Sequence, residues 1–247
     1  MFFRQSSKQA QLHPGRDSRQ LGRPVRQTLG GGQRTLSNQP TVFVVDDDQQ
    51  ARGSVCALVR SMGVDAESFS SAEEFLERYV EGRPGCLITD VRMLNMSGLE
   101  LQEELLRRGI ALPVVVLTAY ARTAITVRAV KAGAVTVLEK PYQDDDLWDA
   151  IRKALAQDAA GRTEHRHRQE LQRRIARLTP AQRGVMDLIV TGKPNKVIAQ
   201  ELDVSIRTVE NRRHEVFEVM QAGSVAELVR MVIDVDLDGE PGPPRED

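Results

Sequence analysis

Between residues 41 and 155 the chain alternates short runs of β-branched and other apolar residues with amphipathic segments. The apolar runs predict strands over Thr41–Val45, Val64–Phe69, Cys86–Thr89, Val114–Leu117 and Val135–Leu138. The segments that follow them predict helices near Gln49–Met62, Ala72–Val80, Leu99–Arg108, Thr123–Ala132 and Asp144–Leu155. Such repeated units require a parallel sheet with helices on both faces. Short connections and right-handed crossovers favour a doubly wound α/β fold with strand order 2-1-3-4-5.

The C-terminal part of the chain predicts helices only. A charged connecting helix is expected over Gln157–Leu178, and Thr179-Pro180 provides an N-cap and a first-turn proline for a helix that runs to about Thr191. The remaining helices are expected near Asn195–Leu202, from about Ile206 to Met220, and after Ser224. A short turn between two of them has the outline of a helix-turn-helix, so an all-α helix-turn-helix domain follows the α/β domain.

These patterns also define domain boundaries and two tails. The prediction is a basic tail over residues 1–40, the α/β domain over 41–158, a helical linker over 159–175, the helical domain over 176–235 and a tail over 236–247. Neither tail has an apolar pattern that could offset the entropy of ordering, so both are expected to be disordered. For residues 1–40, a reading frame assigned too far upstream is the alternative.

The charge is unevenly distributed between the two predicted domains. With His neutral, the formal charges sum to about −6 over residues 41–160 and about +4 over residues 161–233. Nucleic acid is therefore an expected partner of the second domain only. Cys56 and Cys86 lack both the spacing of a zinc site and the density of a secreted disulfide scaffold, so reduced core residues are expected. No membrane span or secretory signal is predicted, and the protein is expected to be cytosolic.

An aspartate, Asp90, stands directly after the apolar run Cys86–Thr89. By itself such a residue more often caps a strand or starts a turn. In strand order 2-1-3-4-5, however, Asp46 and Asp47 follow the neighbouring first strand, and ligands bind at this edge where the strand order reverses. Ionised carboxylates there would repel one another by roughly 1 to 4 kcal/mol per close pair. Oxygen ligands of this kind predict Mg²⁺, with a phosphate as a further ligand.

Two more strand ends point to the same edge. Thr118 closes the fourth predicted strand, and Lys140 follows the fifth. Together these residues predict that Asp90 is a phosphoacceptor that attacks a phosphoryl group in line. Mg²⁺ and Lys140 would neutralise charge on the phosphoryl oxygens, and the hydroxyl of Thr118 would donate a hydrogen bond to one of these oxygens.

The helix expected from Ile206 to Met220 has two different faces. Val209 and Val216 lie on its apolar face, and the outer face is expected to enter the major groove with Arg207, Glu210, Asn211, His214 and Glu218. Asn211 suits adenine and Glu210 suits cytosine. The residues expected to contact phosphates are Lys196, Thr208, Arg212 and Arg213. The alternative is a solvated helix that merely packs in a bundle.

Residues 41–158 resemble the receiver domain of two-component response regulators, which has a flavodoxin-like fold. The motifs that carry the resemblance are Val44-Val45-Asp46-Asp47, Thr89-Asp90-Val91-Arg92-Met93, Met96-Ser97-Gly98, Leu117-Thr118-Ala119 and Glu139-Lys140-Pro141. The resemblance implies that a sensor histidine kinase donates the phosphoryl group to Asp90. It also implies that Mg²⁺ lies among Asp46, Asp47, Asp90 and the backbone carbonyl of Arg92.

Residues 176–235 resemble the output domain of the LuxR, NarL and FixJ regulators, and FixJ most closely. The motifs are Leu178-Thr179-Pro180-Ala181-Gln182-Arg183, Gly192-Lys193-Pro194-Asn195-Lys196-Val197-Ile198-Ala199 and Ser205-Ile206-Arg207-Thr208-Val209-Glu210-Asn211. This resemblance implies a transcription regulator that binds promoter DNA as a homodimer formed on phosphorylation, with RNA polymerase as a candidate partner. The fourth helix, around Leu228 and Val232, would contribute to pairing.

Two positions depart from the receiver pattern. Leu94 stands where the family usually has proline, and Val137 stands where it usually has an aromatic that moves with the hydroxyl of Thr118. These departures suggest an alternative, a receiver that signals through protein contacts without phosphorylation. A phosphohydrolase using Asp90 as a turnover nucleophile ranks lower, because Arg92 rather than an acid stands two residues after Asp90. A non-enzymatic regulator is therefore expected.

Overall fold

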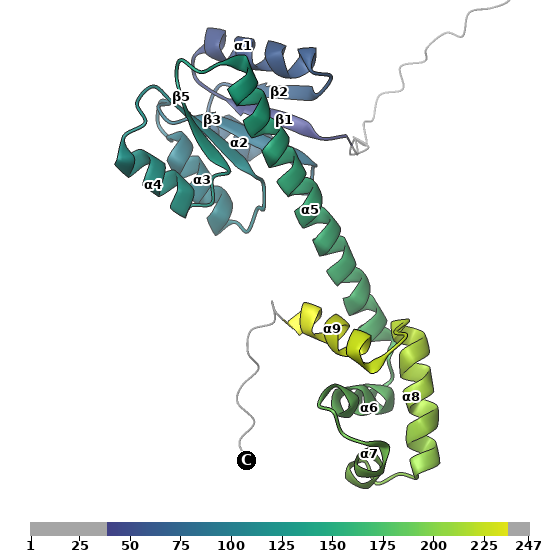
Figure 1. Cartoon of the computed structure of the whole chain (residues 1–247). Coiled ribbons are helices and arrows are strands. Elements are labelled where there is room, and N and C mark those ends of the chain that lie inside the picture. Colours follow the sequence, from purple (N-terminus) through teal and green to yellow (C-terminus); the bar gives the residue numbers. More distant parts are fainter. Residues whose placement is uncertain (1–38, 237–247) are drawn as a thin grey trace, which may run out of the picture. The chain divides into compact units, whose positions relative to one another are not determined.

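The computed structural model describes residues 39–236, and it contains the predicted parallel sheet (Figure 1). Its strands are β1 (Thr41–Val45), β2 (Asp65–Phe69), β3 (Gly85–Asp90), β4 (Val114–Thr118) and β5 (Thr136–Glu139). The strand order is β2-β1-β3-β4-β5 and every neighbouring pair is parallel, which confirms the doubly wound fold. The predicted tails fall on residues 1–38 and 237–247, which lie outside the described residues.

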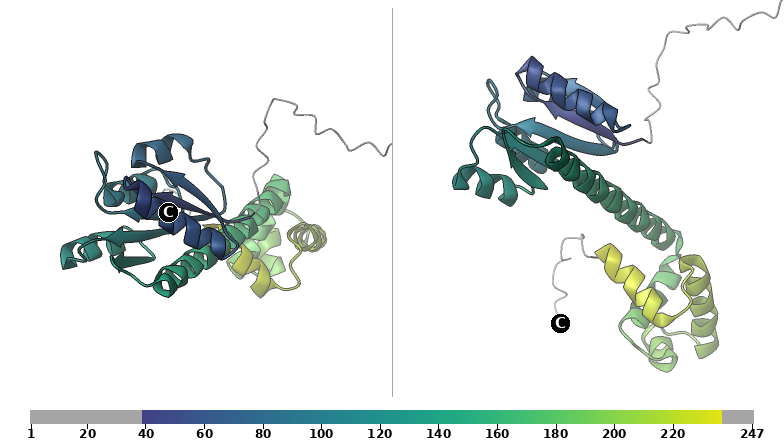
Figure 2. Two further views of the ribbon diagram at one scale, coloured as in Figure 1. Left: turned by 90° about the horizontal axis from the view of Figure 1, so that it is seen from above. Right: turned by 45° about the horizontal axis from the view of Figure 1, so that its top comes forward.

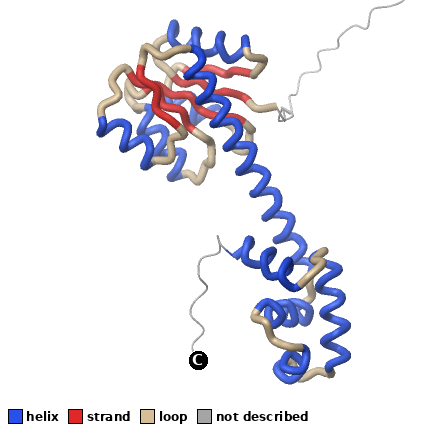
Figure 3. The backbone as a smooth tube through the Cα atoms, viewed as in Figure 1, coloured by secondary structure: helices blue, strands red, loops and turns tan. Residues whose placement is uncertain are grey.

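Helices cover both faces of the sheet (Figures 2 and 3). They are α1 (Gln49–Ser61), α2 (Ala72–Arg78), α3 (Gly98–Arg107), α4 (Thr123–Lys131) and α5 (Asp144–Arg177). Successive side chains of a strand point to opposite faces, so the strands contribute to two separate cores. Phe43 and Val45 belong to the core that includes residues of α2, α3 and α4. Val42 and Val44 belong to the core that includes residues of α1 and of the first turns of α5.

Helix α5 is longer than the sequence pattern predicts. A helix over Asp144–Leu155 and a separate one over Gln157–Leu178 were expected, but a single helix runs without interruption over Asp144–Arg177. Neither a proline nor a positive-φ residue lies within it, and Gly161 keeps a helical conformation. Ile151, in its first half, packs in the sheet core, and Ile175, near its end, packs in a core formed with the C-terminal helices.

The C-terminal helices confirm the predicted helix-turn-helix pattern. They are α6 (Pro180–Val190), α7 (Asn195–Glu201), α8 (Ile206–Met220) and α9 (Val225–Asp236). Thr179 caps α6 through a reciprocal pair of hydrogen bonds with Gln182, and the Ser205 hydroxyl caps α8. Over residues 39–236, no helix combines the length and the apolar character needed to cross a membrane.

The start of α3 is packed tightly against the end of β3. A Cβ atom added to Gly98 would lie 2.1 Å from the backbone oxygen of Asp90 and 2.7 Å from the hydroxyl oxygen of Thr89. Gly53, in the middle of α1, has no such neighbour within 4 Å. A side chain can therefore be added at Gly53 but not at Gly98 without displacing the backbone at Asp90.

We predict that Gly98→Ala lowers the free energy of unfolding by about 1–3 kcal/mol, because β3 or α3 must shift to relieve the overlap. Gly53→Ala is the matched control, and it should raise that free energy by about 0.5–1 kcal/mol through its better helix propensity. Urea unfolding can be followed by the fluorescence of Trp148, the single tryptophan, which packs against the sheet core. A Gly98→Ala variant as stable as the parent would contradict the close packing.

Candidate functional site

The predicted site residues follow four neighbouring strands at the carboxyl edge of the sheet. Asp90 ends β3 and is paired with Leu117 of β4, and Val45, which precedes Asp46, is paired with Thr89 of β3. Thr118 ends β4, and Lys140 comes directly after β5. The strand register therefore brings these positions to one edge, as the strand order predicts.

The side chain of Lys140 joins two of the carboxylates. Its Nζ atom donates to Asp90 Oδ1 over 2.6 Å and to Asp46 Oδ2 over 3.1 Å. Both aspartates are buried, with 8 % of Asp90 and 4 % of Asp46 exposed. Burial by itself lowers the pKa of Lys140, but the hydrogen bonds to Asp90 and Asp46 outweigh this effect and raise the pKa overall. Lys140 is thus held as the ammonium ion.

The other oxygen of each carboxylate is bound by the backbone. Asp46 Oδ1 accepts from the N–H of Asp48 over 2.9 Å, and Asp90 Oδ2 accepts from the N–H of Arg92 over 2.6 Å. Burial raises the pKa of Asp46, an effect that the Asp48 N–H and Lys140 only partly oppose. These bonds fix the orientation of both carboxylates and direct one oxygen of each toward the same cation.

Asp47 and Thr118 have other partners in this structure. Asp47 is exposed, and its Oδ2 atom accepts from the N–H of Leu94 over 3.1 Å. The Thr118 hydroxyl is almost fully buried; it donates to the carbonyl oxygen of Tyr120 over 3.1 Å and accepts from the N–H of the same residue over 3.2 Å. The hydroxyl of Thr118 is therefore occupied by the backbone of the next loop.

The predicted magnesium ligands are oxygen donors of the right chemical kind, but they are not gathered into a finished site. Within residues 39–236, no group of three or more His, Cys, Asp or Glu side chains is arranged to hold a metal ion. Asp46 and Asp90 do converge closely enough to share one cation, namely the ammonium of Lys140. A hard cation with oxygen ligands fits this pair, and Asp47 and the carbonyl of Arg92 remain predicted ligands.

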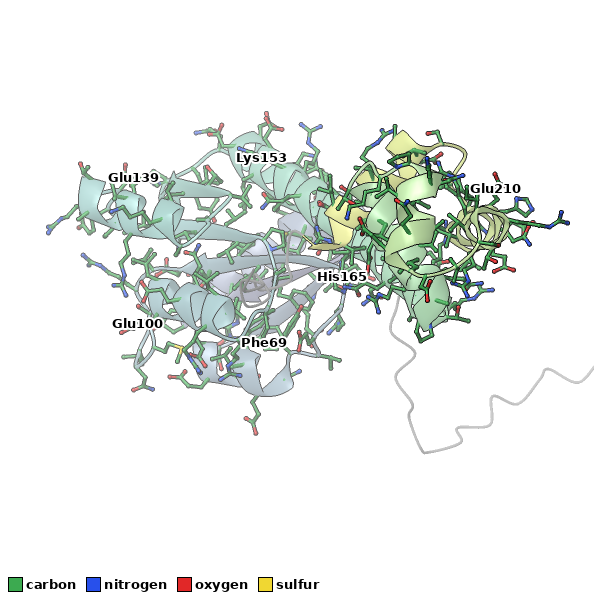
Figure 4. All side chains as sticks on the ribbon, turned by 90° about the horizontal axis from the view of Figure 1, so that it is seen from below. Phe69, Glu100, Glu139, Lys153, His165 and Glu210 are labelled. Carbon is green, nitrogen blue, oxygen red and sulfur yellow. The ribbon has the colours of Figure 1, made fainter. Side chains whose placement is uncertain are left out.

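The predicted DNA-binding residues lie on α7 and α8. Four of them are exposed and have no ion-pair or hydrogen-bond partner within the described part of the chain: Lys196, Arg207, Glu210 and Asn211. In Figure 4 Glu210 lies on the solvent side of α8. Arg212 is half-buried. This outer surface of α8 carries the hydrogen-bonding groups that base edges require.

Three other members of the predicted set already have protein partners. Thr208 is hydrogen-bonded to Ser205 at the cap of α8. Arg213 is 3.4 Å from the side-chain oxygen of Asn195 and lies over the ring of Phe217. His214 is 3.4 Å from Glu218, an ion pair only when the imidazole is protonated.

The predicted part of α9 in pairing stays a prediction, and the structure shows which of its side chains are already used within the chain. Leu228 of α9 is fully buried in the core of its own helical group, so its side chain is not available to a second subunit. The large apolar residues of α9 that are exposed are Val225 and Ile233.

Sequence reasoning also missed Asp48 and Tyr120. The Asp48 carboxylate caps α1 by accepting from the N–H groups of Gln50 and Ala51, and a third aspartate just before a predicted helix was an available signal for that cap. The ring of Tyr120 lies 4.9 Å from the guanidinium carbon of Arg92. No sequence pattern predicts this cation–π contact, because it joins residues in the loops after two different strands.

Two family descriptions match the chain. Residues 42–152 match the response regulator receiver domain, and residues 176–232 match the bacterial regulatory proteins of the luxR family. A receiver domain joined to a LuxR-type DNA-binding domain defines a two-component transcriptional response regulator.

Full-length relatives give the same result. Nodulation protein W of Bradyrhizobium diazoefficiens is 39% identical over 81% of this chain and 88% of its own length. The transcriptional regulatory protein FixJ of Azorhizobium caulinodans is 41% identical over 78% of this chain and 91% of its own length. The solved low-resolution structure of the response regulator StyR matches with a TM-score of 0.71 and 39% identity, covering 79% of this chain and 98% of that one. The chain belongs to the LuxR/FixJ family of response regulators, and its relatives point to a non-enzymatic function.

The raised pKa of Asp46 predicts a stability effect with a definite sign. An acid whose pKa in the folded state lies above its ordinary value of 3.8 destabilises the fold when it is ionised. Stability from this group is present below the unfolded pKa and is lost as the pH rises through the folded pKa. Asp46→Asn removes the charge, so it should raise the free energy of unfolding at pH 7.

Asp47→Asn is the control for this prediction, because Asp47 is exposed and its neutralisation should change the free energy of unfolding by less than about 0.5 kcal/mol. Urea unfolding at pH 5 and pH 7 measures both variants. If Asp46→Asn destabilised the fold at pH 7, the ionised carboxylate of Asp46 would be a net stabilising group and the prediction would be wrong.

Proposed function

We propose that a sensor histidine kinase phosphorylates Asp90 and that this modification controls promoter binding by the helix-turn-helix. The observation that carries the proposal is the Lys140 ammonium, which binds Asp90 and Asp46 together at the carboxyl edge of the sheet. A buried carboxylate beside a fixed cation is suited to accept a phosphoryl group, because the cation neutralises charge that develops in the transition state. Membership of the family supports the same assignment.

The transfer is an in-line displacement at phosphorus. The Arg92 N–H holds Oδ2 of Asp90, so we assign Oδ1, the oxygen beside Lys140, as the nucleophile. A bond from Oδ1 to phosphorus forms while the bond from phosphorus to the kinase histidine nitrogen breaks, and its electron pair remains on that nitrogen. The Thr118 hydroxyl would break its hydrogen bond to the carbonyl of Tyr120 and donate a hydrogen bond to a phosphoryl oxygen instead.

Asp46, Asp47, Asp90 and the backbone carbonyl of Arg92 would hold Mg²⁺. The support for this assignment is a donor set made only of oxygen atoms and the convergence of Asp46 and Asp90 on one cation. When bound, the ion supplies positive charge that neutralises the phosphoryl oxygens. Lys140, whose raised pKa keeps it protonated, would add a second positive charge beside the phosphoryl oxygens.

Promoter DNA is the proposed target of the C-terminal helices. Asn211 and Glu210 would contact base edges, with Arg207 on the same groove-facing side. Lys196 and Arg212 would contact phosphates. Thr208, Arg213 and His214 would do so only by exchanging their present partners. The protein would bind DNA as a homodimer that forms on phosphorylation, and it would contact RNA polymerase. It would act in the cytoplasm, where the DNA lies.

A receiver that signals through protein contacts without phosphorylation is the second candidate. Val137 packs partly buried against the sheet core in a position where the family usually has an aromatic, and the Thr118 hydroxyl is bound to Tyr120. Both observations favour a receiver in which a phosphoryl group would not be sensed by the usual joint movement of the Thr118 hydroxyl and an aromatic side chain. A promoter response that is the same in Asp90→Asn as in the parent would favour this candidate.

Phosphorylation is tested by incubating the protein with Mg²⁺ and acetyl phosphate and measuring the intact mass. The parent should be labelled and Asp90→Asn should not, because an amide cannot form the acyl phosphate. Chelation of Mg²⁺ with EDTA should lower the labelling of the parent. Asp149→Asn, which removes an exposed carboxylate on α5, should be labelled like the parent. Equal labelling of Asp90→Asn would exclude Asp90 as the acceptor.

DNA binding is tested with a duplex selected by the parent protein from a random-sequence library. Lys196→Ala should weaken binding and reduce the dependence of log Kd on log salt concentration by about one, because one phosphate contact is lost. Arg107→Ala removes the same charge from α3 and should leave both quantities unchanged. Identical salt dependence of Lys196→Ala and Arg107→Ala would show that Lys196 makes no phosphate contact.

A further inference from the structure

A buried carboxylate on α5 has no role in the site described above. The apolar stripe of α5 that packs on the sheet includes Leu147, Ile151 and Ala154, and the next inward position is taken by Asp158. Only 6 % of Asp158 is exposed. An ionised carboxylate is costly to bury unless charges and hydrogen bonds compensate it, so its partners are informative.

Asp158 binds the start of the strand that carries Asp90. Its Oδ2 atom accepts from the N–H of Gly85, the first residue of β3, over 2.9 Å. The same oxygen accepts from Nε of Arg162, one turn further along α5, over 2.7 Å. A Cβ atom at Gly85 would lie 1.9 Å from the carbonyl oxygen of Thr41, so the close approach of β3 to β1 requires glycine there.

Arg162 extends the contact to the loop before β3. Its two terminal nitrogens donate to the carbonyl oxygens of Gly82, over 2.7 Å, and of Arg83. A guanidinium presents several donors in a rigid plane, which lets one side chain bind a carboxylate and two carbonyl groups at once. The loop, the first residue of β3 and α5 are thereby joined through a single pair of charged side chains.

We propose that Asp158 and Arg162 form a polar clamp that holds the beginning of the linker part of α5 on the receiver domain. The clamp lies beyond residue 152, where the receiver match ends, and before residues 163–167, which are exposed. It joins the linker to β3, whose other end is Asp90. The second part of the inference rests on the proposed function and concerns DNA binding. Without the clamp, phosphorylation of Asp90 would no longer change the affinity for DNA.

The chain contains a matched exposed pair for comparison. Asp149 and Arg152 form an ion pair on the same helix, with 68% and 62% of their side chains exposed. Exposed pairs of this kind contribute little to stability, whereas a buried pair that also binds the backbone fixes one geometry. Asp149→Asn is therefore the control for Arg162→Met and Asp158→Asn.

The clamp itself is tested by hydrogen exchange on the full chain. Arg162→Met and Asp158→Asn should accelerate exchange of the Gly85 N–H and of the N–H groups of residues 158–166 at least tenfold, and Asp149→Asn should not. If a single variant fails to fold, the double variant Asp158→Leu/Arg162→Met replaces the pair with apolar side chains, and it should fold while Gly85 still exchanges faster. Unchanged exchange at Gly85 in the folded variants would overturn the clamp.

The output role is tested by the ratio of DNA affinities with and without acetyl phosphate, using the selected duplex. Arg162→Met should be labelled on Asp90 like the parent, but its ratio should fall to one third of the parent ratio or less. Normal labelling with an unchanged ratio would overturn the role of the clamp in output. If the parent itself is not labelled, the proposed function fails and the output role fails with it, while hydrogen exchange still decides the clamp.

Discussion

The carboxyl edge of the sheet depends on the ammonium group of Lys140. Asp46 and Asp90 are buried side by side on neighbouring strands, and their charges would oppose folding if no cation lay between them. Lys140 reaches both from the loop after β5, so the outer strand of the sheet is tied to its centre. Two carboxylates and one ammonium leave a surplus negative charge, and a phosphoryl group on Asp90 would increase it. The buried hydroxyl of Thr118 would then have a strong acceptor in place of a neutral carbonyl.

The central strands β1, β3 and β4 could be predicted because their burial on both faces leaves few polar residues in them. The short connections then favour one strand order and register. That order brings Asp46, Asp90 and Lys140 together at one edge of the sheet. The length of α5 could not be predicted, since Ala156 and Gln157 interrupt the apolar pattern without interrupting the helix. A polar helical segment carries no periodic signal that separates a continuous helix from two shorter ones.

Side-chain partners were less accessible to sequence reasoning than backbone positions. Thr118 was correctly expected at the strand end, but its bond to the backbone of Tyr120 depends on the conformation of the following loop. Asp158 and Arg162 stand in a charged segment and look like solvated residues in the sequence. Their burial is a tertiary effect, because it arises only when α5 lies beside the start of β3. Charged residues in a sequence are thus usually exposed. This expectation fails where the fold buries a charged side chain together with its ion-pair partner.

The two ends of β3 suggest how a local charge can influence a distant helix. Asp90, at one end, is bound to Lys140, and Gly85, at the other, is bound to Asp158 of α5. A fully buried strand packed on both faces resists deformation along its length, so a displacement at one end is transmitted rather than absorbed. Val137 supplies no aromatic ring to carry a rearrangement through β5. The strand is therefore a physically direct connection between Asp90, the proposed phosphoacceptor, and the helix that leads to the DNA-binding domain.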